Sequence, residues 1–103
     1  EYPKMGPGMR KALVRMAGPK YEFRTRILAM QALQRMNYLD TEFAANLFEG
    51  ASNFNSRLNS STWPVINHFL GQNETKQLLK KEVQKWTDSS NKSKQMVAKI
   101  SGN

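Results

Sequence analysis

The sequence predicts an all-α domain, and two observations carry that prediction. Apolar residues recur at spacings of three and four through most of the chain, whereas no segment of useful length alternates apolar and polar residues as a strand does. Glycine, proline and asparagine clusters divide the chain into six segments of roughly 8 to 18 residues. A chain of 103 residues can bury one small core. We therefore expect residues 1–103 to form a single helical domain, and because the sequence begins without Met or an apolar leader we expect a fragment of a larger protein.

The first two segments predict a helical hairpin. Residue 7 or 8 to residue 17 forms the first helix, which Gly18-Pro19 ends. Residues 20–36 form the second and longest helix, whose apolar side chains cover an arc of about 220° when placed at helical spacing. An arc that wide must be covered from two sides. We therefore expect burial of four of its side chains: Phe23, Ile27, Met30 and Leu33.

The middle of the chain predicts a second hairpin. Asp40 is placed to cap a third helix that runs to Gly50. Ser61 or Thr62 is expected to cap a short fourth helix, with Pro64 in its first turn, where a missing N–H has no cost. For residues 52–58 the sequence leaves two possibilities open, a continuation of the third helix or a separate turn.

The last segments predict two lysine-rich helices. The fifth helix begins after Asn73, and the sixth follows a cap at Thr87-Asp88. Short connections imply three antiparallel hairpins, which fit either a HEAT-like α-solenoid fragment or an irregular helical bundle. The two-sided apolar arc of residues 20–36 favours the solenoid, in which an inner helix touches its own hairpin and the next.

Residues 26–33, Arg-Ile-Leu-Ala-Met-Gln-Ala-Leu, resemble the second helix of a HEAT repeat, with an Arg near the start, then Ala, then Ala-Leu. The resemblance implies that Arg26, which falls inside the apolar arc, is a buried structural arginine paired with a carboxylate. The turn at residues 18–21 holds no acid, so we expect the partner to be Glu22 or an acid of the next hairpin such as Asp40 or Glu42.

The succession of irregular hairpins ending in a basic helix also resembles the non-catalytic C-terminal helical region of gluzincin aminopeptidases, the aminopeptidase N family. That resemblance implies that the zinc motif His-Glu-x-x-His of the family would lie in another part of the parent protein.

Residues that carry catalysis are scarce. The chain has no cysteine, and its single histidine, His68, has no further ligands spaced for a zinc site. No Gly-x-Ser-x-Gly motif surrounds any serine, and the acids are scattered. We therefore expect no intrinsic enzymatic site and no cofactor. The methionines and the two tryptophans, Trp63 and Trp86, are interpreted as core filling.

The positive charge lies at both ends of the chain. Residues 1–36 carry a net charge of +6, residues 37–73 of −2 and residues 74–103 of +4. The first hairpin contains a candidate basic patch that could face phosphates: Arg10, Arg15, Lys20, Arg24 and Arg35. An acidic protein or an anionic membrane surface would respond to the same field.

The compartment is undecided from sequence. No apolar run approaches the ~20 residues of a transmembrane helix. Three Asn-x-Ser/Thr sequences, at Asn59, Asn73 and Asn91, lean towards an extracytoplasmic origin. The leading functional hypothesis is a non-catalytic interaction or scaffolding module whose partner is a protein domain, in another chain or in the same parent chain. The alternative is nucleic-acid binding through the basic first hairpin.

Overall fold

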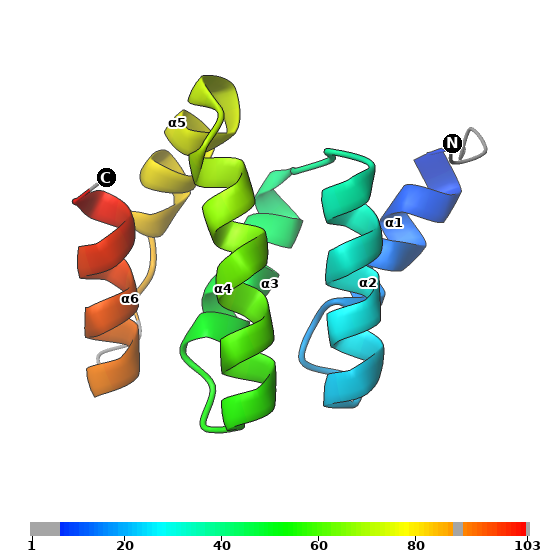
Figure 1. The fold of residues 1–103 in the computed structure, drawn as a ribbon, viewed down its shortest axis with the longest axis horizontal. Coiled ribbons are helices and arrows are strands. Elements are labelled where there is room, and N and C mark those ends of the chain that lie inside the picture. Colours follow the sequence, from blue (N-terminus) through cyan, green and yellow to red (C-terminus); the bar gives the residue numbers. More distant parts are fainter. Residues whose placement is uncertain (1–6, 88–89, 103) are drawn as a thin grey trace.

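The computed structural model describes residues 7–87 and 90–102, and within them the chain is all-α, as predicted (Figure 1). The described residues form six α-helices and no strand: α1 (Pro7–Met16), α2 (Phe23–Arg35), α3 (Thr41–Ala51), α4 (Ser56–Leu70), α5 (Asn73–Val83) and α6 (Asn91–Ser101).

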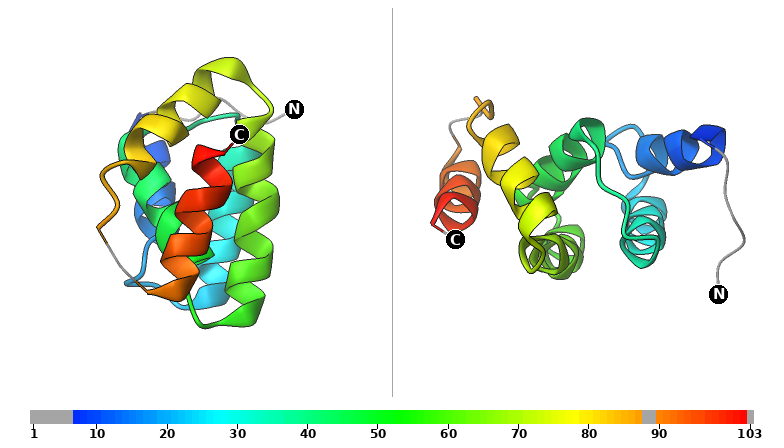
Figure 2. Two further views of the ribbon diagram at one scale, coloured as in Figure 1. Left: turned by 90° about the vertical axis from the view of Figure 1, so that its left-hand side faces the viewer. Right: turned by 90° about the horizontal axis from the view of Figure 1, so that it is seen from above.

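Consecutive helices pair into three antiparallel hairpins, α1–α2, α3–α4 and α5–α6. We call α1, α3 and α5 the first helices and α2, α4 and α6 the second helices of these hairpins. The second helices all run in the same direction (Figure 1). Seen from above, α1 and α3 lie on one side and α2 and α4 on the other, while α5 crosses obliquely (Figure 2). The hairpins therefore stack side by side, over extents of 39 × 30 × 19 Å.

Helix α3 lies at the centre of the core because it contacts α1, α4, α5 and α6. Phe43 and Phe48 of α3 are buried, and the Phe43 ring meets Phe69 of α4 edge to face at 6.1 Å. The close approach of α3 to α4 depends on Gly50. A Cβ atom at Gly50 would lie 2.6 Å from Oγ1 of Thr62, which is nearer than packed atoms allow.

The predicted apolar arc of α2 is buried at its centre and half-buried at its flanks. Met30 and Leu33 are fully buried, as expected. The prediction was wrong for Phe23 and Ile27, which are half-buried. Phe23 is the first residue of α2 and adjoins the preceding turn, and Ile27 lies about 100° around the helix from Arg26, at the flank of the arc.

Helix α2 begins at Phe23 rather than at Lys20. Glu22 adopts an extended conformation and caps the helix, with its side-chain oxygen accepting a hydrogen bond from the Arg24 N–H at 3.1 Å. The three residues before Phe23 are therefore used to reverse the chain after Gly18-Pro19.

Helix α4 is longer than predicted, and the expected cap at Ser61 or Thr62 is wrong. The cap is Asn55, whose Oδ1 accepts a hydrogen bond from the Leu58 N–H at 3.0 Å. Pro64 consequently lies inside the helix, where the helical hydrogen bond to the Ser60 carbonyl is missing. Residues 52–55 form the turn that the sequence left undecided.

The predicted cap of the last helix was also misplaced. Ser90 caps α6 by accepting a hydrogen bond from the Ser93 N–H at 3.2 Å, whereas Thr87 lies outside the helix and Asp88 lies outside the described residues. Trp86 joins the last hairpin to the core. Its ring meets Phe48 edge to face at 5.8 Å, and its Nε1 donates to Ser93 Oγ at 3.1 Å. Both Trp86 and Trp63 are half-buried and pack against the core.

Candidate functional site

Arg26 connects three helices at the junction of the first two hairpins. Its side chain is 3 % exposed, as predicted. The Nε atom donates to the Ala17 carbonyl at 3.0 Å, and Nη2 donates to the Asn46 carbonyl at 3.4 Å. The Nη1 atom lies 2.6 Å from Glu49 Oε1, an ion pair without the alignment of a hydrogen bond. Arg26 thus binds the residue that follows the C-terminal end of α1 and an acid of α3.

The carboxylate partner differs from the three predicted acids. Glu22 caps α2, Asp40 caps α3, and Glu42 is exposed in the first turn of α3. Glu49 is two turns further along α3, on the side that faces Arg26. Its other oxygen, Oε2, accepts a hydrogen bond from Asn53 at 2.9 Å, so the buried pair is tied directly to the turn between α3 and α4.

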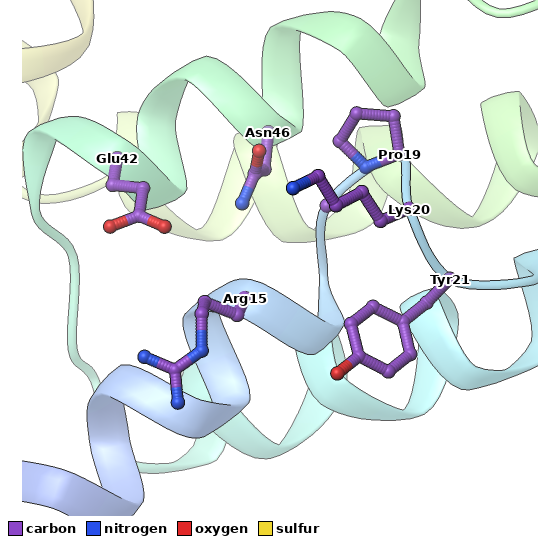
Figure 3. Close-up of a pocket in the computed structure, with 7 residues that line it drawn as sticks. Arg15, Pro19, Lys20, Tyr21, Glu42 and Asn46 are labelled. Atoms are coloured by element: carbon purple, nitrogen blue, oxygen red, sulfur yellow. The ribbon is translucent and has the colours of Figure 1, made fainter.

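A hollow of about 310 Å³ lies beside the turn of the first hairpin (Figure 3). Arg15 of α1, Lys20 and Tyr21 of the turn, and Glu42 and Asn46 of α3 surround it. The Asn46 amide is fixed, because its Nδ2 donates to the Val14 carbonyl at 2.8 Å. The hollow therefore combines two cations, a phenol and one carboxylate at the surface.

A second hollow, also of about 310 Å³, separates the turn of the first hairpin from the turn of the second. Tyr21 and Glu22 line it from one turn, and Asn53 and Asn55 from the other. Tyr21 therefore borders both hollows. Phe54, between the two asparagines, is 87 % exposed. We call the two turns, residues 17–22 and 52–55, together with the first turns of α2 and α4, the turn edge.

The turn edge repeats one arrangement in two hairpins. In the first hairpin an exposed aromatic residue, Tyr21, precedes the cap of α2, and the exposed Arg24 is the second residue of that helix. In the second hairpin the exposed Phe54 precedes the cap of α4, and the exposed Arg57 is again the second residue. The third hairpin has Lys92 at the same position of α6.

The acids of the helices are confined to two first helices, α3 and α5. The second helices contain seven Lys and Arg residues and no Asp or Glu. The first helices contain six Lys and Arg residues and four Glu. None of the second helices has an acid in its first turn, and because they run in the same direction their positive dipole ends share one edge (Figure 1).

The five predicted patch residues do not lie on one element. Arg15 and Lys20 line the first hollow. Arg24 and Arg35 are exposed near opposite ends of α2, and Arg24 lies 5.1 Å from the centre of the Phe23 ring. Arg10 of α1 lies 5.1 Å above the Tyr38 ring.

Tyr38 donates a hydrogen bond from its hydroxyl to Asp40 Oδ2 at 2.8 Å. This hydrogen bond raises the pKa of Tyr38 above its usual value, and partial burial and the Asp40 charge add to the shift. Asp40 also accepts from the Phe43 N–H at 2.7 Å, which confirms its predicted role as a cap. Arg10 is therefore placed against a structural tyrosine rather than beside Arg15 and Lys20.

The remaining polar candidates belong to helix ends. His68 lies with Nε2 3.0 Å from Asn37 Oδ1, and Gln72 donates to the same oxygen at 2.7 Å. Asn37 has a positive φ of 55°, which asparagine tolerates well. Within residues 7–87 and 90–102, no group of three or more His, Cys, Asp or Glu is placed to hold a metal ion.

The three Asn-x-Ser/Thr asparagines have different surroundings. Asn59 is half-buried in α4 and donates from Nδ2 to the Ala51 carbonyl at 2.6 Å, so its amide is already engaged. Asn73 and Asn91 are exposed at the first positions of α5 and α6. No helix in the part of the chain that the structure describes is long and apolar enough to cross a membrane.

No protein-family model, curated protein or solved structure matches this chain. Sequence reasoning did not identify Tyr21 and Phe54 as surface residues. The available signal was their shared position, one residue before a capping side chain and three before an arginine, but it is recognisable only when both caps are known.

Proposed function

We propose that this chain is a non-catalytic helical-repeat module of the HEAT-like α-solenoid type, which holds a partner protein domain. Three features support the repeat assignment: the side-by-side hairpins, the common direction of the second helices, and the buried Arg26 that links one hairpin to the next. The C-terminal helical region of an aminopeptidase N family protein remains a proposed parent, in which the partner would be another domain of the same chain.

The observation that carries the interaction proposal is the uneven placement of exposed apolar side chains. Four large ones are exposed among the described residues: Met9 (55 %), Tyr21 (45 %), Leu28 (68 %) and Phe54 (87 %). All four lie in the first two hairpins, although the third hairpin has comparable helices. Leu28 lies on the same face of α2 as two arginines, where a solvated helix would carry a polar residue. A partner that covers Leu28 would remove this apolar surface from water.

Site-specific photo-crosslinking in the cells that make the protein tests this proposal. A benzophenone amino acid replaces Leu28 in one variant and Gln77, which is exposed on α5, in the control. We expect a protein adduct of defined mass from position 28 that an excess of the unmodified domain removes, and none from position 77. Equal adducts from both positions, or none from position 28, would contradict a partner surface on the first hairpin.

Nucleic-acid binding is the second candidate, and the absence of acids from the second helices favours it. Exposed cations on these helices include Arg24, Arg35, Arg57 and Lys94, and no helical carboxylate of the same three helices offsets them. A surface of one sign attracts the phosphate backbone and releases its counterions. The sequence predicted a nucleic-acid interface on the first hairpin alone. The charge distribution in the structure favours an interface formed by the second helices of all three hairpins.

A salt titration separates the two candidates. If nucleic acid is the ligand, the affinity for mixed-sequence DNA or RNA falls steeply with the logarithm of the salt concentration, with a slope of about −0.7 to −0.9 per phosphate contact. Absence of binding at about 50 mM salt, where such contacts are strong, removes this candidate and leaves the interaction module unaffected.

A further inference from the structure

The turn edge presents an aromatic ring and an arginine at the same register in two adjacent hairpins. Tyr21 and Phe54 each lie one residue before a capping side chain, and Arg24 and Arg57 each follow that cap by two residues. Because the caps fix the start of each helix, the repeat is a property of the fold rather than of loop conformation alone. The hollow of about 310 Å³ between the two turns separates the aromatic–arginine pair of the first hairpin from that of the second.

Exposure makes the rings available. Phe54 is 87 % exposed and Tyr21 is 45 % exposed, so both can contact a ligand without any rearrangement of the core. Asn53 and Asn55 flank Phe54 and are held by hydrogen bonds, from Asn53 Nδ2 to Glu49 and from the Leu58 N–H to Asn55. The ring of Phe54 therefore projects from an ordered turn.

An exposed aromatic ring three residues before an exposed arginine suits a nucleotide better than it suits a carboxylate. Arg24 itself lies 5.1 Å from the centre of the Phe23 ring and 4.0 Å from Glu22 Oε2, so a phosphate bound by Arg24 would replace the contact with Glu22. A base offers a flat π face that stacks on the ring, and the phosphate attached to it pairs with the guanidinium. Only unpaired bases expose their faces, because base stacking in a duplex covers them. The positive dipole ends of α4 and α6, which have the uncharged caps Asn55 and Ser90, and the cations of α2, α4 and α6 favour phosphates at this edge, whereas the Glu22 carboxylate already caps α2.

We propose that the turn edge binds single-stranded nucleic acid, with bases stacked on Phe54 and Tyr21 and phosphates held by Arg57 and Arg24. This inference rests on the nucleic-acid candidate above and adds the strand form, the binding surface and the role of each side chain. The Tyr21–Arg24 pair and the Phe54–Arg57 pair bind two nucleotides of the same nucleic-acid strand. The nucleotides between those two lie in the hollow that separates the turns.

Fluorescence anisotropy with a labelled oligonucleotide of about 15 thymidines tests the proposal, and a duplex of equal length is the comparison. We expect the single strand to bind more tightly than the duplex. Phe54→Ala should weaken single-strand binding about tenfold, and Tyr21→Ala less, because stacking on one aromatic ring contributes a factor of about 5 to 150 per base. Phe54→Trp, which keeps an aromatic ring at this position, should bind the single strand about as tightly as the parent chain does. Arg57→Ala and Arg24→Ala should each reduce the salt slope by about 0.7.

Two control substitutions are placed on α1 and α5, outside the turn edge. Met9→Ala removes a comparably exposed apolar side chain from α1, and Lys81→Ala removes an exposed cation from α5. Neither should change single-strand affinity by more than about twofold, apart from the small uniform effect of one charge. Phe54→Ala should keep the melting temperature of the parent chain, since its ring contributes little to the core.

Three other outcomes would overturn the turn-edge proposal. Equal binding of single strand and duplex, with no effect of Phe54→Ala, overturns the turn-edge site while the nucleic-acid candidate survives. No binding of either oligonucleotide at about 50 mM salt removes both. A labelled poly-Glu peptide that binds with the same dependence on Phe54 would assign the edge to acidic peptides and overturn the proposal.

Discussion

The first and second helices of the three hairpins differ in charge. The first helices supply the carboxylates that stabilise the fold, whereas the second helices supply the basic surface that we propose for ligand binding. Glu42, Glu49, Glu74 and Glu82 all lie on α3 and α5, whereas every Lys and Arg of α2, α4 and α6 is without an Asp or Glu in the same helix. The one buried cation of the second helices, Arg26, finds its carboxylate across the interface on α3. No Asp or Glu lies within α2, α4 or α6, so these helices carry a net positive charge. The nearest carboxylate to Arg24 is that of Glu22, the cap of α2, whose Oε2 lies 4.0 Å from Arg24 Nη1.

Arg26 and Arg24 of α2 give the sharpest test of this comparison. Arg26→Ala should lower the free energy of unfolding by roughly 2 to 4 kcal/mol, because it removes a buried ion pair and leaves the Ala17 and Asn46 carbonyls without their donor. Arg24→Ala, on the exposed face, should cost about 0.5 kcal/mol or less. Urea denaturation of both variants measures the difference, and equal midpoints would contradict a structural role for Arg26.

Gly50 tests how closely the first and second helices of one hairpin must approach. Gly50→Ala should cost about 1 to 3 kcal/mol, because the new methyl group meets Thr62 Oγ1, and this outweighs the gain in helix propensity. In a Thr62→Ala background the two nearest Thr62 atoms are absent and the flexible end of the Met30 side chain, at 3.2 Å, remains, so the same substitution should cost much less. Thermal denaturation of the four variants gives the coupling, and additive effects would place the obstruction elsewhere.

Pro64 allows a prediction in the opposite direction. Pro64→Ala should stabilise the protein by about 1 kcal/mol, because it restores the helical donor to the Ser60 carbonyl inside α4 at an exposed position. A rise in melting temperature would confirm that the helix continues through this residue. If the proline occupied the first turn, as the sequence suggested, the substitution would give no gain.

The smallest expected effect concerns Tyr38 at high pH. The hydrogen bond to Asp40 raises the pKa of Tyr38 in the folded state above the usual value near 10. The folded state therefore holds this proton more firmly than the unfolded state, so its contribution to stability is complete below pH 10 and declines as the pH rises through the folded pKa. Tyr38→Phe should flatten stability over that range. An unchanged decline would assign the loss to other groups.

The sequence predicted the helices more reliably than their ends. The helical period located all six, and Asp40 was correctly identified as a cap because an acid stands before an apolar run. The start of α4 was missed because Pro64 suggested a first helical turn, whereas Asn55 supplies the cap nine residues earlier. Tertiary packing of α4 against α2 and α3 compensates for a proline that local propensity would exclude.

Arg26 shows what a sequence pattern can and cannot specify. Its place inside the apolar arc predicted a buried, paired arginine, and burial is confirmed. The choice of Glu49 among the acids depended on how α3 turns relative to α2, which follows from the packing of Gly50 and Asn46 and not from spacing along the chain. The turn edge was hidden for the same reason, since it forms only when two hairpins lie side by side.

Backbone chemical-shift mapping of the labelled protein with an oligothymidine tests whether the second helices and the turn edge form the ligand surface, because every described helix reports in one experiment. We expect the shift changes to concentrate on the turn edge, from Tyr21 to Arg24 and from Phe54 to Arg57, and to extend along α2, α4 and α6. Shifts centred on α3 and α5, where the helical acids lie, or spread evenly over all basic residues, would contradict the division of roles between the first and second helices.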